Sequence, residues 1–281
     1  MRTVYVSDLD GTLLGPDAQL SDFSRRTLEE MLKAGLVFTV ASARSVYSMR
    51  ANLAGLSLSL PAVEFNGAFI SDLPSGRHHA IHSIEPEIAE ELYRLIRGHG
   101  SVPFISSFDG SEDRACYGEI VNEGMQWFLD DRKRVNDPRL RFVPDLAQTL
   151  RDPIVCLTVI GQENVLQGLK SAIVERHSQS VWVHFYENQY SPGWHWLTVH
   201  PFQATKDRAI REVLETCGLN PCELVVFGDH DNDLEMFDMA HRAIAVANAT
   251  ENLKRRATQV IGPNCEDSVV RFIREDWVRD E

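Results

Sequence analysis

Short, mostly apolar runs alternate with amphipathic stretches near both ends of this chain. The apolar runs lie at residues 3–7, 36–41, 62–65, 223–227 and 243–246. Continuous apolar runs of this length are typical of parallel strands that are buried on both faces. The stretches between them carry apolar residues at helical spacing, as after Ser21, an expected helix cap, and over residues 206–216. Strands that alternate with helices predict an α/β core with a doubly wound, parallel, Rossmann-like sheet.

The middle of the chain has a different pattern. Helical spacing follows Pro86 and recurs over residues 165–173. Strand-like runs lie at residues 154–160, 181–186 and 195–199. The last two of these runs would pair across a short turn, so the whole stretch predicts an α+β cap domain inserted into the core. The predicted division of the chain is a core at residues 1–82 and 197–281, with the inserted domain at residues 83–196.

Two acidic segments stand where buried strands are predicted to end. Asp8 and Asp10 directly follow the first apolar run, and Asp229 opens a second acidic segment after the run at residues 223–227. The carboxyl ends of parallel strands meet at one edge of the sheet, where ligands bind. Converging carboxylates repel one another, which indicates a bound cation, and oxygen ligands favour Mg²⁺. A carboxylate beside that cation can attack as a nucleophile while another transfers a proton.

Composition narrows the classes of function. The chain has 281 residues, with 28 Lys and Arg against 41 Asp and Glu, so its formal net charge is −13. This balance argues against nucleic acid and against an anionic membrane surface as partners. The five cysteines are an odd number without a C-x-x-C pair, which favours a reduced, intracellular protein. Since no apolar run is long enough to span a bilayer and no signal-peptide pattern is present, we expect a cytoplasmic protein.

The two acidic segments carry a resemblance to a known family. Residues 8–14, Asp-Leu-Asp-Gly-Thr-Leu-Leu, resemble the first motif of the haloacid dehalogenase superfamily. Residues 228–236 resemble its last motif in the form found in Cof-type phosphatases, and the inserted block resembles the α/β cap of that subgroup. The resemblance implies a Mg²⁺-dependent phosphatase that hydrolyses small phosphorylated metabolites, such as sugar phosphates, through an aspartyl-phosphate. The cap would select the substrate.

By position in the motifs, the resemblance implies a role for each candidate residue. Asp8 is the nucleophile, and Asp10 is the general acid that later serves as base for the hydrolytic water. Mg²⁺ is held by the Asp8 carboxylate, the Asp10 backbone carbonyl and Asp229. The residues implied to bind phosphoryl oxygens are Leu9, Ser42, Ala43 through its backbone N–H, Lys206 and Asn232. Asp233 is implied to anchor Lys206 or to lie just behind the metal ligands.

Some positions leave more than one interpretation open. Ala43 and Asp207 stand where the family commonly has glycine. Arg44 either contacts the substrate or pairs with an acid. Asn66 and Gly67 predict a turn, although Asn66 follows a strand that ends near the predicted site.

Two alternatives to a phosphatase use the same residues. A phosphomutase-type phosphotransferase would pass the phosphoryl group to an acceptor hydroxyl instead of water. A non-catalytic sensor would only bind a phosphate ligand and would have no need of Asp10, which argues against it. The oligomeric state and the physiological substrate stay open at this point.

Overall fold

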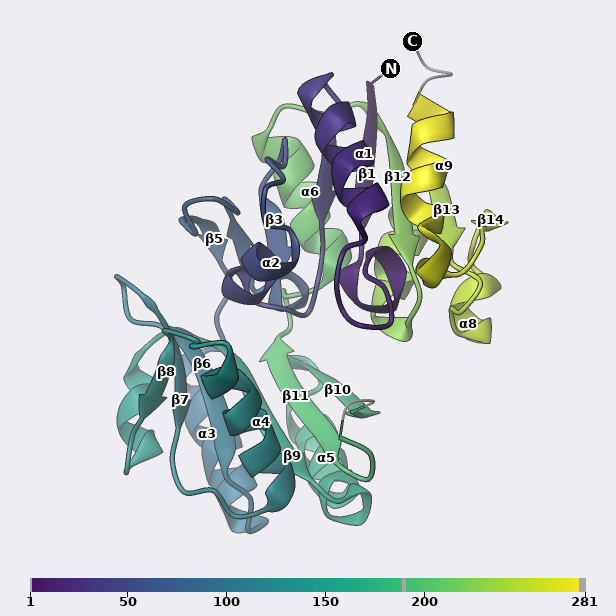
Figure 1. The fold of residues 1–281 in the computed structure, drawn as a ribbon. Helices are drawn as coiled ribbons and strands as arrows, with labels where there is room; N and C mark the ends of the chain where they lie inside the picture. The colour runs from purple at the N-terminus through teal and green to yellow at the C-terminus, as the bar shows by residue number, and fades with distance from the viewer. Residues whose placement is uncertain (1, 189–190, 278–281) are drawn as a thin grey trace. The chain divides into compact units, whose positions relative to one another are not determined.

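A computed structural model describes residues 2–188 and 191–277, which divide into two compact units (Figure 1). The core unit comprises Met1–Ile81 and Thr205–Glu281, and the inserted unit comprises His82–Ala204. The structure thus ends the inserted unit at Ala204, whereas the sequence places its end at residue 196. The reason is β11 (His195–Pro201), which hydrogen-bonds to strands of the inserted unit along its length and cannot be divided between the two units.

The core unit is built on a five-stranded sheet whose neighbouring strands all run parallel. In spatial order its strands are β14 (Gln259–Val260), β13 (Arg242–Ala245), β12 (Cys222–Gly228), β1 (Arg2–Ser7) and β2 (Phe38–Val40). A parallel bridge between Ala41 and Val63 places β3 (Ala62–Glu64) beside the end of β2. On one side of the boundary between β1 and β12 the strands follow in the order β1, β2, β3, and on the other side in the order β12, β13, β14. That boundary is a topological switch point, where ligands bind in open α/β sheets.

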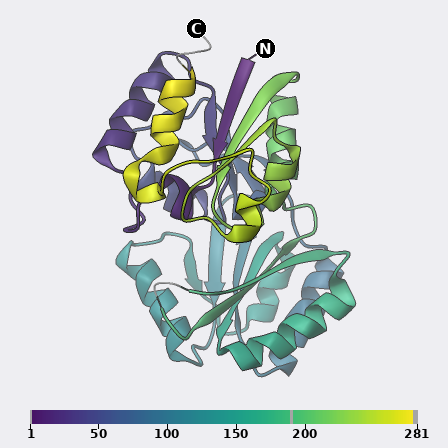
Figure 2. The same ribbon diagram turned by 90° about the vertical axis from the view of Figure 1, so that its right-hand side faces the viewer.

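Helices cover both faces of this sheet. Figure 2 shows α1 and α9 on one side of the strands and α6 on the other. The helices of the core unit are α1 (Asp22–Lys33), α2 (Val46–Asn52), α6 (Lys206–Thr216), α7 (Leu234–Met239), α8 (Glu251–Lys254) and α9 (Ser268–Trp277). The predicted doubly wound α/β core is therefore confirmed.

Local sequence signals account for several boundaries in the core unit. Ser21 caps α1, because its hydroxyl accepts a hydrogen bond from the Ser24 N–H at 3.0 Å. The predicted helix over residues 206–216 is α6. The predicted turn at Asn66 joins β3 to β4 (Phe69–Ser71). β4 pairs with β3 and with β5 (His78–Ile81) in an antiparallel sheet that the sequence pattern does not predict.

The inserted unit has α+β architecture, as predicted. Its six-stranded sheet has the spatial order β10, β11, β9, β6, β7, β8. The further strands are β6 (Pro103–Phe108), β7 (Asp113–Tyr117), β8 (Leu140–Phe142), β9 (Ile154–Gly161) and β10 (Val181–Glu187). The helices are α3 (Pro86–Gly98), α4 (Glu123–Arg134) and α5 (Glu163–His177). The expected antiparallel pairing of β10 with β11 is present over its full length, from Val181 opposite Pro201 to Glu187 opposite His195.

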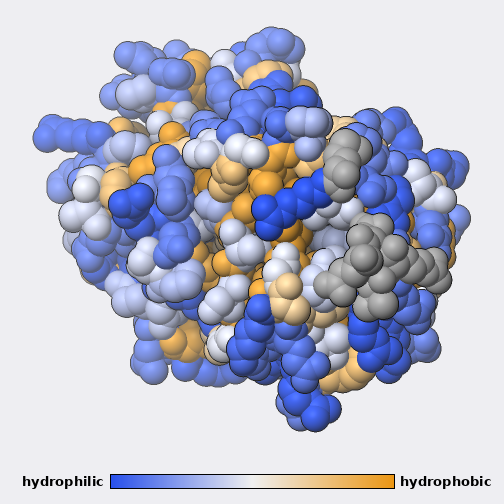
Figure 3. All heavy atoms as spheres, turned by 90° about the horizontal axis from the view of Figure 1, so that it is seen from above, coloured by the Kyte–Doolittle hydropathy of each residue, from blue (hydrophilic) through white to orange (hydrophobic). Residues whose placement is uncertain are grey.

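Hydrophilic residues predominate on the face drawn in Figure 3, and hydrophobic residues show in a band near its middle. Among residues 2–188 and 191–277, no helix has both the length and the apolar character needed to cross a membrane.

Candidate active site

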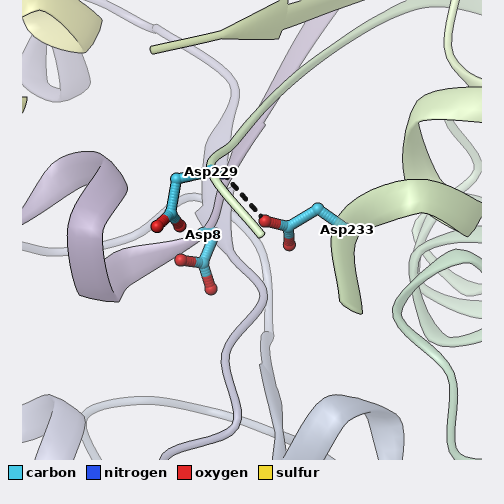
Figure 4. Close-up of side chains that lie close together, drawn as sticks. All are labelled: Asp8, Asp229 and Asp233. Atoms are coloured by element: carbon cyan, nitrogen blue, oxygen red, sulfur yellow. Dashed lines mark hydrogen bonds between the residues drawn. The ribbon is translucent and has the colours of Figure 1, made fainter. Parts of the chain in front are cut away.

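Three carboxylates gather at the switch point of the core sheet. Asp8 directly follows β1, and its N–H donates to the carbonyl of Phe227 in β12 at 3.0 Å, so the two strands end side by side. Asp229 directly follows β12, and Asp233 precedes α7. Figure 4 shows the three side chains close together, and ligand oxygens of all three lie within 4.8 Å of one another. The structure thus brings together acids from opposite ends of the sequence.

Lys206 lies between two of these acids. Its Nζ donates to Asp8 Oδ1 at 2.5 Å and to Asp233 Oδ1 at 2.7 Å, and the residue is only 1% exposed. Burial by itself would lower the pKa of Lys206, but the charges of Asp233 and Asp8 outweigh burial and raise that pKa above its ordinary value. The Lys206 side chain is therefore a fixed positive charge within an acidic protein.

Asp233 has a second set of donors. Its Oδ2 accepts hydrogen bonds from the backbone N–H groups of Asp229, at 3.0 Å, and of His230, at 3.1 Å. The Asp233 carboxylate thus fixes the backbone at the end of β12 while it also anchors Lys206.

Asp229 is held by the loop that follows β1. Thr12 Oγ1 donates to Asp229 Oδ1 at 2.9 Å. Gly11 of the same loop has a φ of +76°, and a Cβ at this position would overlap Asp229 Oδ2. Burial and the charge of Asp233 raise the pKa of Asp229 to about 6, although the Thr12 hydrogen bond lowers it. The sequence pattern does not identify Thr12 as a site residue; the signal at this position is a hydroxyl side chain within the first acidic segment.

The donor set fits a divalent cation. Three carboxylates face a single ammonium group, so the site has an excess of negative charge when the carboxylates are ionised. Burial raises the pKa of Asp8 well above its ordinary value; Lys206 opposes this rise, and Asp233 and Asp229 add to it. A hard cation that takes oxygen ligands would relieve the repulsion and keep Asp8 ionised.

Asp10 does not join this cluster. Its carboxylate accepts two hydrogen bonds from Arg44, from Nε to Oδ2 at 2.7 Å and from NH2 to Oδ1 at 2.6 Å. This is the two-pronged geometry in which a guanidinium binds a carboxylate most strongly. Arg44 NH1 in turn donates to Asn52 Oδ1 at 2.8 Å. Of the two interpretations left open for Arg44, the structure shows the ion pair with an acid.

The residues predicted to bind phosphoryl oxygens lie at the ends of elements of the core unit: after β2, at the start of α6, and in the helical turns Leu9–Leu13 and Asp231–Asp233. Ser42 follows β2, is 1% exposed, and accepts the Arg44 N–H at 3.2 Å through its hydroxyl. Ala43 is exposed and its backbone is not left-handed, so the extra methyl group is tolerated there. Asn232 donates through Nδ2 to Asn66 Oδ1 at 3.2 Å. The Leu9 side chain is fully buried in the core, which leaves only its backbone for ligand binding.

Asp207, the other departure from the family pattern, lies in the first turn of α6. A carboxylate at this end of a helix is favoured by the helix dipole. Its Oδ1 is buried and has no hydrogen-bond partner within the described part of the chain. We have no structural explanation for its position beside Lys206.

Two similar proteins that match nearly the whole of this chain are named phosphatases. A 5-amino-6-(5-phospho-D-ribitylamino)uracil phosphatase of Bacillus subtilis is 23% identical over 275 residues, which cover 95% of each chain. A pyridoxal phosphate phosphatase of Escherichia coli is 25% identical over 280 residues, which cover 96% of this chain and 97% of the other.

Solved structures have the same fold. A protein from Thermotoga maritima matches with a TM-score of 0.78 and 25% identity over 98% of this chain and 97% of its own. A haloacid dehalogenase-like hydrolase from Bacteroides thetaiotaomicron matches with a TM-score of 0.79 and 22% identity over 98% and 99% of the two chains.

The family model for haloacid dehalogenase-like hydrolases matches residues 5–273, nearly the whole chain. The predicted enzyme class, a phosphoric monoester hydrolase, is confirmed by this match together with the phosphatase relatives. The chain therefore belongs to the haloacid dehalogenase-like hydrolase family.

Proposed function

We propose that this enzyme is a Mg²⁺-dependent phosphatase of small phosphorylated metabolites that works through an aspartyl-phosphate. The observation that carries the proposal is the cluster of Asp8, Asp229 and Asp233 around Lys206 at the switch point of the sheet. This arrangement has what phosphoryl transfer requires, a nucleophile and fixed positive charge for the phosphoryl oxygens. The named activities of the relatives, on a ribitylamino-uracil phosphate and on pyridoxal phosphate, support a small phosphorylated substrate.

In the proposed reaction an Asp8 oxygen attacks the phosphorus of the substrate. The bond between phosphorus and the ester oxygen breaks, and Asp10 gives that oxygen its proton. Water then attacks the phosphorus of the aspartyl-phosphate, Asp10 takes the proton of the water, and Asp8 and inorganic phosphate are released. Because Arg44 occupies both oxygens of Asp10 in the structure, Asp10 must turn away from Arg44 to reach the leaving group.

The remaining residues are proposed to bind and orient the phosphoryl group and the metal ion. Lys206 is proposed to neutralise the phosphoryl oxygens, and Ser42, Asn232 and the backbone N–H groups of Leu9 and Ala43 to hydrogen-bond them. We propose that Asp8, the Asp10 carbonyl and Asp229 hold Mg²⁺, which supplies positive charge against the phosphoryl oxygens when it is bound. Asp233 would keep Lys206 in place through the 2.7 Å bond.

We further propose that the inserted unit selects the substrate. It is joined to the core unit by two chain segments, one after β5 and one before α6, and has a hydrophobic core of its own. Such a unit can vary its surface without disturbing the catalytic carboxylates, as a specificity domain requires.

The test is release of inorganic phosphate from p-nitrophenyl phosphate and from a panel of metabolite phosphates. We expect release by the wild type with Mg²⁺, none with EDTA, and none by Asp8→Asn. Asp231→Asn is the matched control, because Asp231 is an exposed acid of the same acidic segment that lies outside the cluster. Activity retained in Asp8→Asn would overturn the proposed role of Asp8. Conversion of one phosphate isomer to another without free phosphate would instead indicate a phosphotransferase, and binding without turnover a sensor.

A further inference from the structure

Three consecutive residues after β3 have left-handed backbone conformations. The φ angles are 46° at Phe65, 56° at Asn66 and 114° at Gly67. Glycine adopts such angles freely and asparagine tolerates them, but a bulky residue such as phenylalanine rarely does. Strained backbone of this kind concentrates at functional sites, where surrounding contacts hold it in place. The segment therefore requires a reason beyond the simple turn that its sequence predicts.

The backbone of this segment connects to the loop after β2. The Asn66 N–H donates to the carbonyl of Ser42 at 2.9 Å, and the Phe65 N–H donates to the carbonyl of Arg44 at 3.1 Å. The Ser42 N–H in turn donates to the carbonyl of Val63 at 3.0 Å. The loop that carries Ser42 and Ala43 is thus bonded to β3 and to the segment after it.

The same segment touches two further parts of the site. Gly67 lies so close to Thr205, the residue before Lys206, that a Cβ at Gly67 would be 2.6 Å from the Thr205 carbonyl oxygen. Asn66 is 5% exposed, and its Oδ1 accepts the hydrogen bond from Asn232 Nδ2 at 3.2 Å. The segment therefore contacts three of the four chain segments that are proposed to hold the phosphoryl group: the loop with Ser42 and Ala43, the start of α6 at Lys206, and the turn that carries Asn232.

We infer that Asn66 is a positioning residue for phosphate binding and that it acts through Asn232. An amide nitrogen carries two hydrogens. One hydrogen of Asn232 goes to Asn66, which fixes the plane of the Asn232 amide and directs the other hydrogen to a phosphoryl oxygen. Asparagine suits this position because it combines a side-chain acceptor with tolerance of a left-handed backbone. The inference rests on the proposed function, since it assigns Asn232 to the phosphoryl group.

The experiment compares Asn66→Gly, Asn232→Ala and the double variant in the full-length protein with Mg²⁺. Glycine keeps the left-handed backbone and removes only the side chain, so the fold should survive, and thermal unfolding checks this. Asn136→Gly is the matched control, because Asn136 also has a left-handed backbone, with φ 50°, but is exposed and lies in the inserted unit. The measurements are the Kd of inorganic phosphate by calorimetry, and KM and kcat for p-nitrophenyl phosphate.

We expect Asn66→Gly to raise the Kd of phosphate by about 2- to 10-fold, the effect of one lost hydrogen bond, while Asn136→Gly leaves it unchanged. If Asn66 acts through Asn232, the double variant binds phosphate no more weakly than Asn232→Ala alone. The inference would be overturned if Asn66→Gly bound phosphate with wild-type affinity. It would also be overturned if the increase in Kd of the double variant equalled the product of the increases in the two single variants. If the wild type binds phosphate but hydrolyses neither p-nitrophenyl phosphate nor any metabolite phosphate, the proposed function is refuted. The Kd values of the variants then still decide the role of Asn66. A wild type that binds no phosphate would refute both.

Discussion

Replacement of Lys206 by methionine tests the electrostatics of the site most directly. Methionine has a similar unbranched shape, so Lys206→Met removes the ammonium group with little change in packing. The variant loses the bonds of 2.5 Å to Asp8 and 2.7 Å to Asp233, while both carboxylates stay buried. The three acids of the cluster then face one another without a neutralising cation in metal-free protein.

The size of the effect follows from these distances. Two unit charges 4.8 Å apart, the outer limit for the oxygens of the cluster, repel by about 3 kcal/mol at an effective dielectric constant of about 20. Loss of one partner from a buried ion pair costs about 3–5 kcal/mol in proteins. We therefore expect the free energy of unfolding to fall by about 3–5 kcal/mol at neutral pH in EDTA. Because protonation of a carboxylate relieves the repulsion, the loss should be smaller at about pH 5 than at about pH 8.

Urea unfolding in EDTA and in Mg²⁺ measures these effects. A bound divalent cation replaces the missing charge, so Mg²⁺ should stabilise Lys206→Met more than it stabilises the wild type. Lys254→Met is the matched control; its Nζ lies 3.0 Å from Glu251, but that carboxylate is 80% exposed, and we expect a loss of at most about 1 kcal/mol. If Lys206→Met in EDTA were as stable as this control, the argument that Lys206 neutralises buried charge would be refuted.

Two further predictions concern a close contact at the site and a buried histidine in the inserted unit. Gly11→Ala should weaken Mg²⁺ binding and lower kcat, because the added methyl group would displace the Asp229 carboxylate. The control Gly55→Ala also has a left-handed backbone, with φ +87°, but has open space around it and should only lose stability. Equal Mg²⁺ affinity of the two variants by calorimetry would contradict this prediction. Burial, helped by the nearby His184, lowers the pKa of His200 from 6.5 to about 3. The unfolded chain thus binds a proton that the folded protein does not, so the stability linked to His200 is complete above pH 6.5 and falls with decreasing pH, by about 2 kcal/mol at pH 5. His200→Gln should show a shallower loss of unfolding free energy between pH 7 and 5 in urea titrations, and an unchanged slope would show that His200 is not the group responsible.

The core fold follows largely from local signals, because the central strands β1, β2 and β12 are short apolar runs that lead into polar residues. The run before Asp8 and the run before Asp229 predict neighbouring strand ends once the parallel, doubly wound order is assumed, and the structure pairs β1 with β12. The end of the inserted unit is harder to predict. β11 continues to Pro201 with the same apolar alternation, and only its pairing with β9 and β10 shows to which unit it belongs.

Contacts between residues far apart in the chain do not follow from the sequence pattern. The pairing of Arg44 with Asp10 depends on how two loops from different strands approach each other, and a sequence pattern carries no such distance. The bond from Thr12 to Asp229 joins residues 217 positions apart. Asn66 has an unusual backbone that the Asn-Gly pair only hints at, and its partner Asn232 is known only from the folded structure.

The most direct test of the account is to find the phosphoryl group on the enzyme. Asp10→Asn should accept phosphate from p-nitrophenyl phosphate but hydrolyse the aspartyl-phosphate slowly, so the covalent form should accumulate. Rapid acid quenching, proteolysis and mass spectrometry would then locate it. We predict one phosphoryl group on the peptide that contains Asp8 and none in the double variant with Asp8→Asn. Phosphate release with no covalent phosphoryl group, or with the group on another residue, would contradict the central claim that Asp8 is the nucleophile.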